Sequence, residues 1–160
     1  MLKKVILLSI LSLFILTVFV LAEEKAAPVS SMKSDLIVDQ LYVKILDKIP
    51  KEGIKVRVVF TVKNVSSYST NSALTSEGKK NCSEGCFIVR LNVLRNYPYG
   101  RYAMLCEKKC RPLRSGESET FYCDDFVKVG TESKYQSLAD YFNWIDESNE
   151  ANNEKTTSIR

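Results

Sequence analysis

Apolar and polar side chains alternate along most of the chain after Asp35, which is the spacing expected of β-strands with one buried face. The most regular run is Ile54 to Val62, and a second run covers Phe87 to Val93. Less regular segments of the same kind predict further strands at 36–45, 102–106, 120–126, 135–141 and 155–159. The pattern therefore predicts about seven strands.

Turn-forming residues separate these segments. The stretches "KIPKEG", "NYPYG" and "RPLRSGES" each combine proline or glycine with polar residues. Outside the first 22 residues, no stretch of ten or more residues has convincing helical spacing of its apolar positions. We therefore predict an all-β fold, an antiparallel β-sandwich, whose core is faced by Ile54, Val56, Val58, Phe60, Val62, Phe87, Val89, Leu91, Phe121 and Leu138.

The N-terminal segment has the character of an export signal. Lys3 and Lys4 precede a nearly continuous apolar run at 5–21, and Ala22 ends it with a small residue. We interpret residues 1–22 as a signal peptide with a hydrophobic leader helix, followed by a polar linker at 23–33 and a folded domain at 34–160. An uncleaved membrane anchor at 5–21 is the alternative, because the run is longer than a usual signal core and shorter than a usual spanning helix. Both interpretations place the domain in a secreted form or at the cell surface, with membrane contact only through this segment.

The composition limits the chemistry. The sequence contains no histidine, which excludes Ser-His-Asp and Cys-His catalysis and every zinc site that requires an imidazole. The net formal charge is +4, and two of the positive charges lie in the leader, so the domain is too weakly basic to suggest nucleic acid as a partner. No recognisable catalytic motif is present, and we expect no enzyme activity, no cofactor and no metal.

The most specific pattern lies near the end of the chain, in "DYFNWIDESNEANN". It matches D-x-x-N-x-x-x-E-x-N-E-x-N-N through Asp140, Asn143, Glu147, Asn149, Glu150, Asn152 and Asn153. Together with "SDLIVDQLYV", "GIKVRVVFTVKNVSS" and "LRSGESETFYC", it resembles the CARDB family over residues 34–159, with the poorest fit at 68–110. The resemblance implies an immunoglobulin-like module of an exported bacterial or archaeal protein, with a role related to cell adhesion or presentation.

Three interpretations of this asparagine-rich run are open. Asn and Asp side chains bond to nearby backbone and tolerate left-handed conformations, so the run can build a hydrogen-bonded corner between the last two strands. Its carboxylates and amides are also the oxygen ligands that calcium prefers, although the spacing and the glycine of a calcium loop are missing. We favour the corner, and a calcium site and a solvated tail are the alternatives.

Five cysteines in an exported chain predict two disulfides and one unpaired thiol. The pair Cys82 and Cys86 has the same spacing as the pair Cys106 and Cys110, on either side of the "NYPYG" turn. In one hairpin register Cys86 faces Cys106 and Cys82 faces Cys110, although a bulge or a different pairing is open. Cys123 is predicted to be the unpaired, buried thiol. A metal site in place of the bridges is the weaker alternative.

The same hairpin carries a candidate binding surface. Tyrosines at a loop tip beside basic residues suit contact with an acidic surface or a glycan. The members are Tyr97, Tyr99, Arg101, Lys108, Lys109 and Arg111. A packed turn and a solvated basic rim are the alternatives. In addition, Asn64 and Asn81 each begin a glycosylation sequon.

These features together predict a non-enzymatic exported or cell-surface module. Loops on its sandwich would bind a cell-envelope protein or glycan. A calcium-dependent carbohydrate- or protein-binding accessory module is the alternative. A fold of this type does not by itself determine the ligand.

Overall fold

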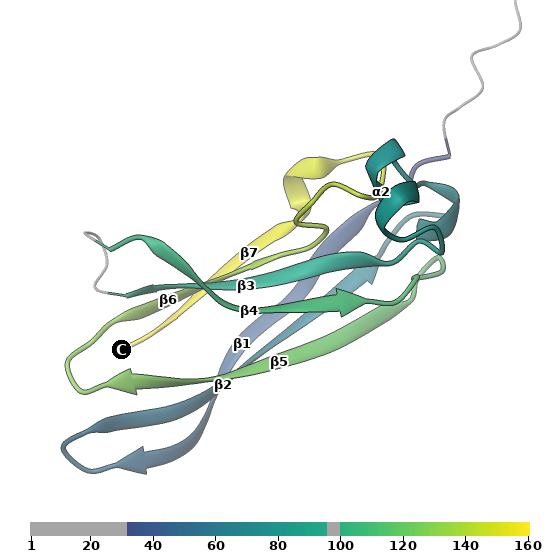
Figure 1. Cartoon of the computed structure of the whole chain (residues 1–160). Coiled ribbons are helices and arrows are strands. Elements are labelled where there is room, and N and C mark those ends of the chain that lie inside the picture. The colour runs from purple at the N-terminus through teal and green to yellow at the C-terminus, as the bar shows by residue number, and fades with distance from the viewer. Residues whose placement is uncertain (1–31, 96–99) are drawn as a thin grey trace, which may run out of the picture. The chain divides into compact units, whose positions relative to one another are not determined.

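Two antiparallel sheets pack face to face in the part of the chain that the computed structural model describes, residues 32–95 and 100–160 (Figure 1). The leader, the linker up to residue 31, and Tyr97 and Tyr99 lie outside the described residues. The strands are β1 (Leu36–Ile49), β2 (Gly53–Asn64), β3 (Phe87–Arg95), β4 (Tyr102–Cys110), β5 (Ser118–Lys128), β6 (Ser133–Leu138) and β7 (Glu154–Ile159). The prediction of an all-β sandwich is therefore confirmed.

The sheets have three and four strands. One has the order β1-β2-β5, and the other has the order β4-β3-β6-β7. The chain crosses between the sheets from β2 to β3, from β4 to β5 and from β5 to β6. This antiparallel arrangement is that of an immunoglobulin-like sandwich.

The alternation of the two central strands, β2 and β3, positions the core. Because successive side chains of a strand point to opposite faces, every second residue is directed into the space between the sheets. Seven predicted core residues are fully buried there: Val56, Val58, Phe60, Val62, Phe87, Val89 and Leu91. Ile54 and Phe121 are partly buried against them.

The prediction that Leu138 faces the core is wrong. In β6 the inward side chains are Ser133, Tyr135 and Ser137, and Leu138 lies on the opposite face. The fully buried ring of Tyr135 determines the register, because a shift by one residue would expose it. Its hydroxyl donates a hydrogen bond to Asp125 Oδ2 at 2.8 Å, so its polar end is satisfied inside the sandwich.

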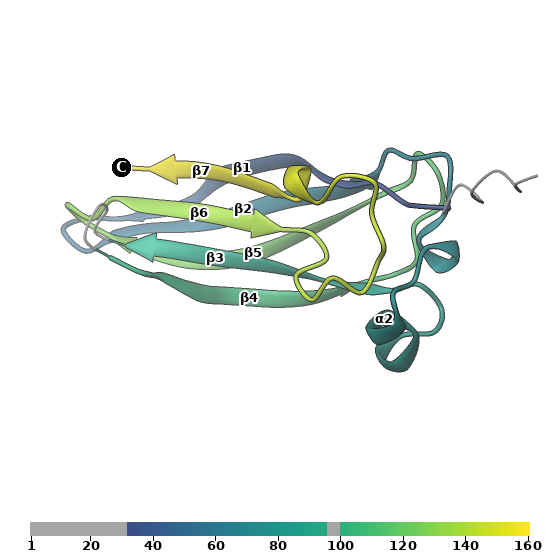
Figure 2. The same cartoon turned by 90° about the horizontal axis from the view of Figure 1, so that it is seen from above.

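The strands run between two ends of different construction (Figure 1). The turn end holds the β1–β2 turn at 50–52, the β5–β6 turn at 129–132, and Arg160. The corner end holds the loops at 65–86 and 139–153, which contain η1 (Thr70–Ser72), α2 (Ser76–Asn81) and η2 (Glu150–Asn152). Figure 2 shows α2 and the 139–153 loop at this same end. Among the described residues, no helix is long and apolar enough to cross a membrane.

Candidate functional site

The asparagine-rich run forms the chain reversal between β6 and β7, and Asp140 organises its beginning. The buried carboxylate of Asp140 accepts hydrogen bonds from the backbone N–H groups of Trp144 at 3.0 Å and Ile145 at 2.7 Å. Asp140 and Asn143 have φ angles of 39° and 53°, a region that Asp and Asn tolerate better than most residues. The loop thereby carries the side chain of Ile145 into the end of the core. Burial raises the pKa of Asp140 to about 6, although both backbone hydrogen bonds oppose the increase.

Glu147 ties this loop to the first strand. Its Oε2 accepts a hydrogen bond from the backbone N–H of Leu36 at 2.6 Å, and its Oε1 accepts one from Asn153 Nδ2 at 2.8 Å. The side chain is almost fully buried, and this burial raises the pKa of Glu147 to about 8 against the lowering effect of the two hydrogen bonds. One buried carboxyl therefore joins β1, the corner loop and the start of β7.

The other members of the run serve the local backbone. Asn149 caps η2, because its Oδ1 accepts a hydrogen bond from the N–H of Ala151 at 3.1 Å. Glu150 lies in the first turn of the same short helix. Asn152 Nδ2 donates to Asp35 Oδ1 at 2.8 Å, a second link between the loop and the beginning of β1. The residues of the sequence pattern thus lie together at one corner of the sandwich.

The corner also contains buried oxygen atoms without a hydrogen-bond partner among the described residues. They are Ser34 Oγ, Ser137 Oγ, Asn152 Oδ1 and Asn153 Oδ1. Oxygen atoms of this kind bind water or a hard cation. In the described part of the chain, however, no three His, Cys, Asp or Glu side chains are grouped so that they could hold a metal ion. The corner therefore offers neutral oxygen atoms, and the described residues contain no cluster of carboxylates there that could surround a metal ion.

The disulfides join different cysteines from those predicted. Cys82 is bonded to Cys86, just after α2, and Cys106 in β4 is bonded to Cys123 in β5. The predicted hairpin pairing is wrong, and so is the prediction that Cys123 is unpaired. The free thiol is that of Cys110, which is buried.

The sheet geometry explains this difference. Cys110 lies opposite Phe87, the first residue of β3, so Cys86 precedes the ladder and has no partner position in it. β4 and β5 are edge strands of different sheets, and the Cys106–Cys123 bond joins them across one open side of the sandwich. Burial raises the pKa of the Cys110 thiol, which makes it a small core side chain and not a nucleophile.

The structure divides the predicted basic surface. Arg101 precedes β4 at the turn end, whereas Lys108 and Lys109 lie near the last residue of β4 and Arg111 follows it at the corner end. Most of a strand of 9 residues separates the two groups. Arg111 is moreover engaged with Glu117, since its Nη1 donates to Oε2 at 2.9 Å. These basic residues do not form one surface.

One of the two glycosylation sequons is inaccessible. Asn64 is fully buried, and its Nδ2 donates to the backbone carbonyl oxygens of Tyr68 at 2.6 Å and Leu113 at 3.2 Å. The prediction of a modification at Asn64 is therefore wrong, because the amide nitrogen is committed inside the fold. Asn81 is exposed at the end of α2, and its modification stays a prediction.

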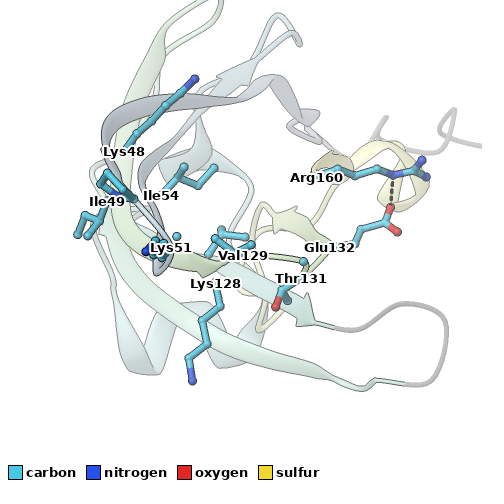
Figure 3. Close-up of a pocket in the computed structure, with 13 residues that line it drawn as sticks. Lys48, Ile49, Lys51, Ile54, Lys128, Val129, Thr131, Glu132 and Arg160 are labelled. Atoms are coloured by element: carbon cyan, nitrogen blue, oxygen red, sulfur yellow. Dashed lines mark hydrogen bonds and ion pairs between the residues drawn. The ribbon is translucent and has the colours of Figure 1, made fainter.

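A groove lies at the turn end, between the β1–β2 turn and the β5–β6 turn (Figure 3). Its volume is about 500 Å³. Gly53 allows the two turns to approach, because a Cβ at this position would collide with the carbonyl oxygen of Val127. Much of the lining is apolar and comes from Ile49, Pro50, Ile54, Val127 and Val129, the last of which is 68% exposed.

Basic side chains surround this apolar lining. Lys48 lies near the end of β1, Lys51 lies in the β1–β2 turn and Lys128 is the last residue of β5, and none of them has an ion pair among the described residues. Arg160 is compensated, since its Nε lies 3.0 Å from Glu132 Oε1. In Figure 3, Lys48 and Lys128 extend to opposite sides of the groove, and the Arg160–Glu132 pair borders it. The groove combines an apolar lining with uncompensated positive charge.

This groove was not predicted from the sequence. The stretches "DKIPKEG" and "VKVG" do place lysines beside apolar residues at two turns, which is the signal that could have indicated it. The turns meet only because β2 pairs with β5, with Gly53 opposite Lys128. Strand pairing, and not a local pattern, creates the site.

Comparison with known proteins agrees with this architecture. The two-sheet topology defines an immunoglobulin-like module. The CARDB family model matches residues 33–157, and the chain therefore belongs to the CARDB family, a family of non-catalytic immunoglobulin-like domains. Membership suggests an adhesion-related module.

One solved structure of low sequence identity shares the fold, and two further structures are similar at lower scores. The crystal structure of the CARDB domain of the PF1109 protein from Pyrococcus furiosus, in complex with di-metal ions, has a TM-score of 0.51 and 16% identity, and covers 79% of this chain and 92% of that chain. The solution NMR structure of the same domain has a TM-score of 0.48 and 17% identity, with 79% and 94% covered. β-Glucosidase 3B from Thermotoga neapolitana has a TM-score of 0.46 and 15% identity, and the match covers 79% of this chain but only 16% of that chain. A comparison with proteins of curated function found no significant match.

Proposed function

We propose that this protein is a non-enzymatic, exported or cell-surface binding module whose ligand occupies the groove at the turn end. The observation that carries the proposal is the groove itself, which is apolar inside and has the unpaired cations Lys48, Lys51 and Lys128 around it among the described residues. Membership of the CARDB family supports an adhesion-related role. The two disulfides support a location of the domain in an oxidising compartment. Residues 1–22 would direct the domain there, either as a cleaved signal peptide or as a membrane anchor.

The chemistry of the groove favours an acidic protein segment with apolar side chains. Apolar side chains of such a segment would be buried against Ile54 and Val129. This burial would stabilise the complex by roughly 25 cal/mol per Å² of apolar area removed from water. Its carboxylates would be attracted by the three lysines, which accelerates association and selects against basic partners. An open groove between two turns can accept a short length of chain without prior rearrangement of the sandwich.

A peptide titration tests this proposal. The full chain, exported with its own leader, is titrated against a fluorescein-labelled peptide in which glutamate alternates with leucine. We expect saturable binding that weakens as salt is added, because part of the attraction is between exposed charges. The variant with Lys51→Glu and Lys128→Glu should lose this binding. The matched control, Lys108→Glu with Lys109→Glu, makes the same change of charge at the corner end and should bind like wild type.

The other outcomes would overturn the proposal. An equal loss in both double variants would show that net charge, and not the groove, attracts the peptide. Binding to vesicles of anionic phospholipid without binding to the peptide would make the turn end a membrane contact. Self-association that Lys51→Glu with Lys128→Glu abolishes, again without peptide binding, would identify a second copy of the chain as the occupant.

A calcium-dependent carbohydrate- or protein-binding module is the second candidate. It is supported by the unpaired buried oxygens of Ser34, Asn152 and Asn153, since Asn153 is bonded to Glu147 and Ser34 pairs with Glu147 in an isolated β-bridge. A cation held by these oxygens would stabilise the corner. This candidate predicts a dependence of the melting temperature on calcium, which the first candidate does not.

A further inference from the structure

Three aromatic side chains follow Asp140 at the corner end. Tyr141 and Phe142 are 40% and 45% exposed, and their rings meet edge to face with centroids 5.0 Å apart. Phe142 stacks on Trp144, with centroids 5.6 Å apart and ring planes inclined by 21°. We call Tyr141, Phe142 and Trp144 the aromatic shelf. Exposed apolar groups gathered in this way on a soluble domain mark a contact surface.

A hollow of about 310 Å³ lies where the shelf meets α2, lined by Phe142, Trp144, Glu77 and Asn81. Asn81 Nδ2 donates to Glu77 Oε1 at 2.8 Å, which orients both polar side chains. In the described part of the chain, no donor bonds to Asn81 Oδ1, so this acceptor is available to a ligand. The hollow combines aromatic rings with a fixed amide and carboxylate, the composition of a small-molecule site.

The two sides of the hollow are locked to each other. Gly78 of α2 packs so closely on the carbonyl of Trp144 that a Cβ would collide with it. The hydroxyl of Thr75 accepts a hydrogen bond from the N–H of Gly78 at 3.0 Å and donates one to the carbonyl oxygen of Trp144 at 3.0 Å. Asp140 holds the N–H of Trp144 from the other direction. A site built in this way loses little conformational entropy when a ligand binds.

Charges around the shelf are compensated. The guanidinium of Arg90 lies over the ring of Tyr141, 3.3 Å from its centroid, and its Nη2 donates to Glu107 Oε2 at 2.6 Å. Glu77 Oε2 lies 3.7 Å from the ammonium group of Lys80. A neutral ligand therefore complements this surface better than a strongly charged one.

The geometry points to a binding site for neutral glycans, in which a hexose ring stacks on Phe142 and Trp144 while its hydroxyls bond to Asn81 and Glu77. The electron-rich face of an aromatic ring attracts the C–H groups on one face of a sugar ring. Sugar hydroxyls donate and accept, as an amide oxygen and a carboxylate require. The site is separate from the groove at the turn end and would remain if the groove bound nothing.

The single tryptophan of the chain is Trp144, so its emission reports on this site alone. The full chain carrying Ser83→Ala, which removes the Asn81 sequon, is titrated with neutral hexasaccharides of glucose, mannose and xylose. We expect at least one to change the emission saturably. Electrophoresis through gels that contain the matching polysaccharide gives a second readout, in which the protein is retarded.

Variants separate recognition from folding. Phe142→Ala should weaken binding by about tenfold, since it removes one stacking face. Asn81→Ala should weaken it as well, with an unchanged melting temperature. The matched control is Tyr122→Ala, which removes a 56% exposed aromatic side chain on β5 and should leave binding unchanged.

Three results would overturn the inference. The first is the absence of any response to the sugars at millimolar concentration, in both emission and gel mobility. The second is wild-type affinity in Phe142→Ala. The third is a response of Trp144 to the acidic peptide of the groove experiment with none to the sugars, which would make the shelf a protein contact.

Discussion

At the corner end of the sandwich, Asp140, Glu147 and Asn153 are buried. The carboxylates of Asp140 and Glu147 accept hydrogen bonds from backbone N–H groups, and Asn153 Nδ2 donates to Glu147. At the turn end, Lys48 and Lys128 are exposed beside an apolar groove and have no ion pair among the described residues. Both ends join strands of the same two sheets. The two ends differ in the burial of their polar groups, which are buried at the corner end and exposed to water at the turn end.

This difference separates stability from recognition. A buried polar group destabilises the fold unless it finds a partner, so the buried carboxylates of the corner depend on their specific backbone and amide donors. An exposed charge without a partner lowers the stability of the fold very little. The lysines at the turn end can therefore stay unpaired and interact with a ligand. The aromatic shelf connects the two roles, because the rigid corner positions Trp144 through Asp140.

Glu147→Ala should cause the largest loss of stability. It leaves the N–H of Leu36 and the amide of Asn153 without their acceptor, and each unsatisfied buried donor costs roughly 1–3 kcal/mol, so we expect a loss of about 2–6 kcal/mol in the free energy of unfolding. Glu132→Ala, which breaks the exposed pair with Arg160 at the turn end, should stay within about 1 kcal/mol of wild type. Urea unfolding followed by Trp144 fluorescence measures both, and equal losses would remove the contrast between the ends.

Stability should also fall as the pH rises through the range in which Glu147 titrates. Its pKa is raised from 4.5 to about 8 by folding, so between pH 5 and 8 the unfolded chain has lost a proton that the folded protein keeps. One pKa unit corresponds to about 1.4 kcal/mol, and the free energy of unfolding should therefore decrease by about 3 kcal/mol over this range. Asp140, with its pKa raised to about 6, adds to the decrease in the lower part.

Two variants attribute this pH dependence. Glu147→Gln keeps a polar side chain at the position and removes the titration, so most of the slope should disappear. Glu132→Gln at the turn end should retain the slope of wild type. A wild-type protein whose stability is constant from pH 5 to 8 would contradict the assignment.

Removal of the Cys106–Cys123 bond should cost somewhat less than the loss of Glu147. This bond closes a loop of sequence separation 17, which corresponds to about 3 kcal/mol in the loop-entropy model. The variant Cys82→Ser with Cys86→Ser opens a loop of separation 4 and should lose about 2 kcal/mol. A non-reducing peptide map of the exported protein should show these two bonds with a free Cys110, and any bond to Cys110 would contradict the arrangement.

A chelator should have the smallest effect, because both carboxyl oxygens of Glu147 accept hydrogen bonds from the protein itself. Calorimetric melts with and without added calcium should coincide. A drop of several degrees on chelation would favour the calcium-dependent candidate. In that case Asn153→Ala should abolish the difference.

The sequence by itself determined the features that depend on neighbouring residues. Alternation in β2 and β3 predicted which side chains enter the core, because the two-residue period is a property of the extended chain. The run from Asp140 to Asn153 pointed to the family, and in this chain Asp140, Glu147 and Asn153 hold the corner through their hydrogen bonds. In β6, Leu138 was predicted to face the core because it is hydrophobic. The two-residue period alone could not show that Tyr135 occupies the inward face.

Only the tertiary structure decided which segments meet. Cys123 is bonded to Cys106 because β4 and β5 are adjacent edges of different sheets, a relation that spacing along the chain does not contain. The glycosylation sequon at Asn64 is defined by only three consecutive residues. The amide of Asn64 is nevertheless buried, because the fold brings Leu113, 49 positions away in the sequence, against it. The groove likewise exists because β2 and β5 align two distant turns. Periodicity specifies the faces of each strand, whereas the packing of two sheets specifies the edges and ends, and the candidate sites of this protein lie at those ends.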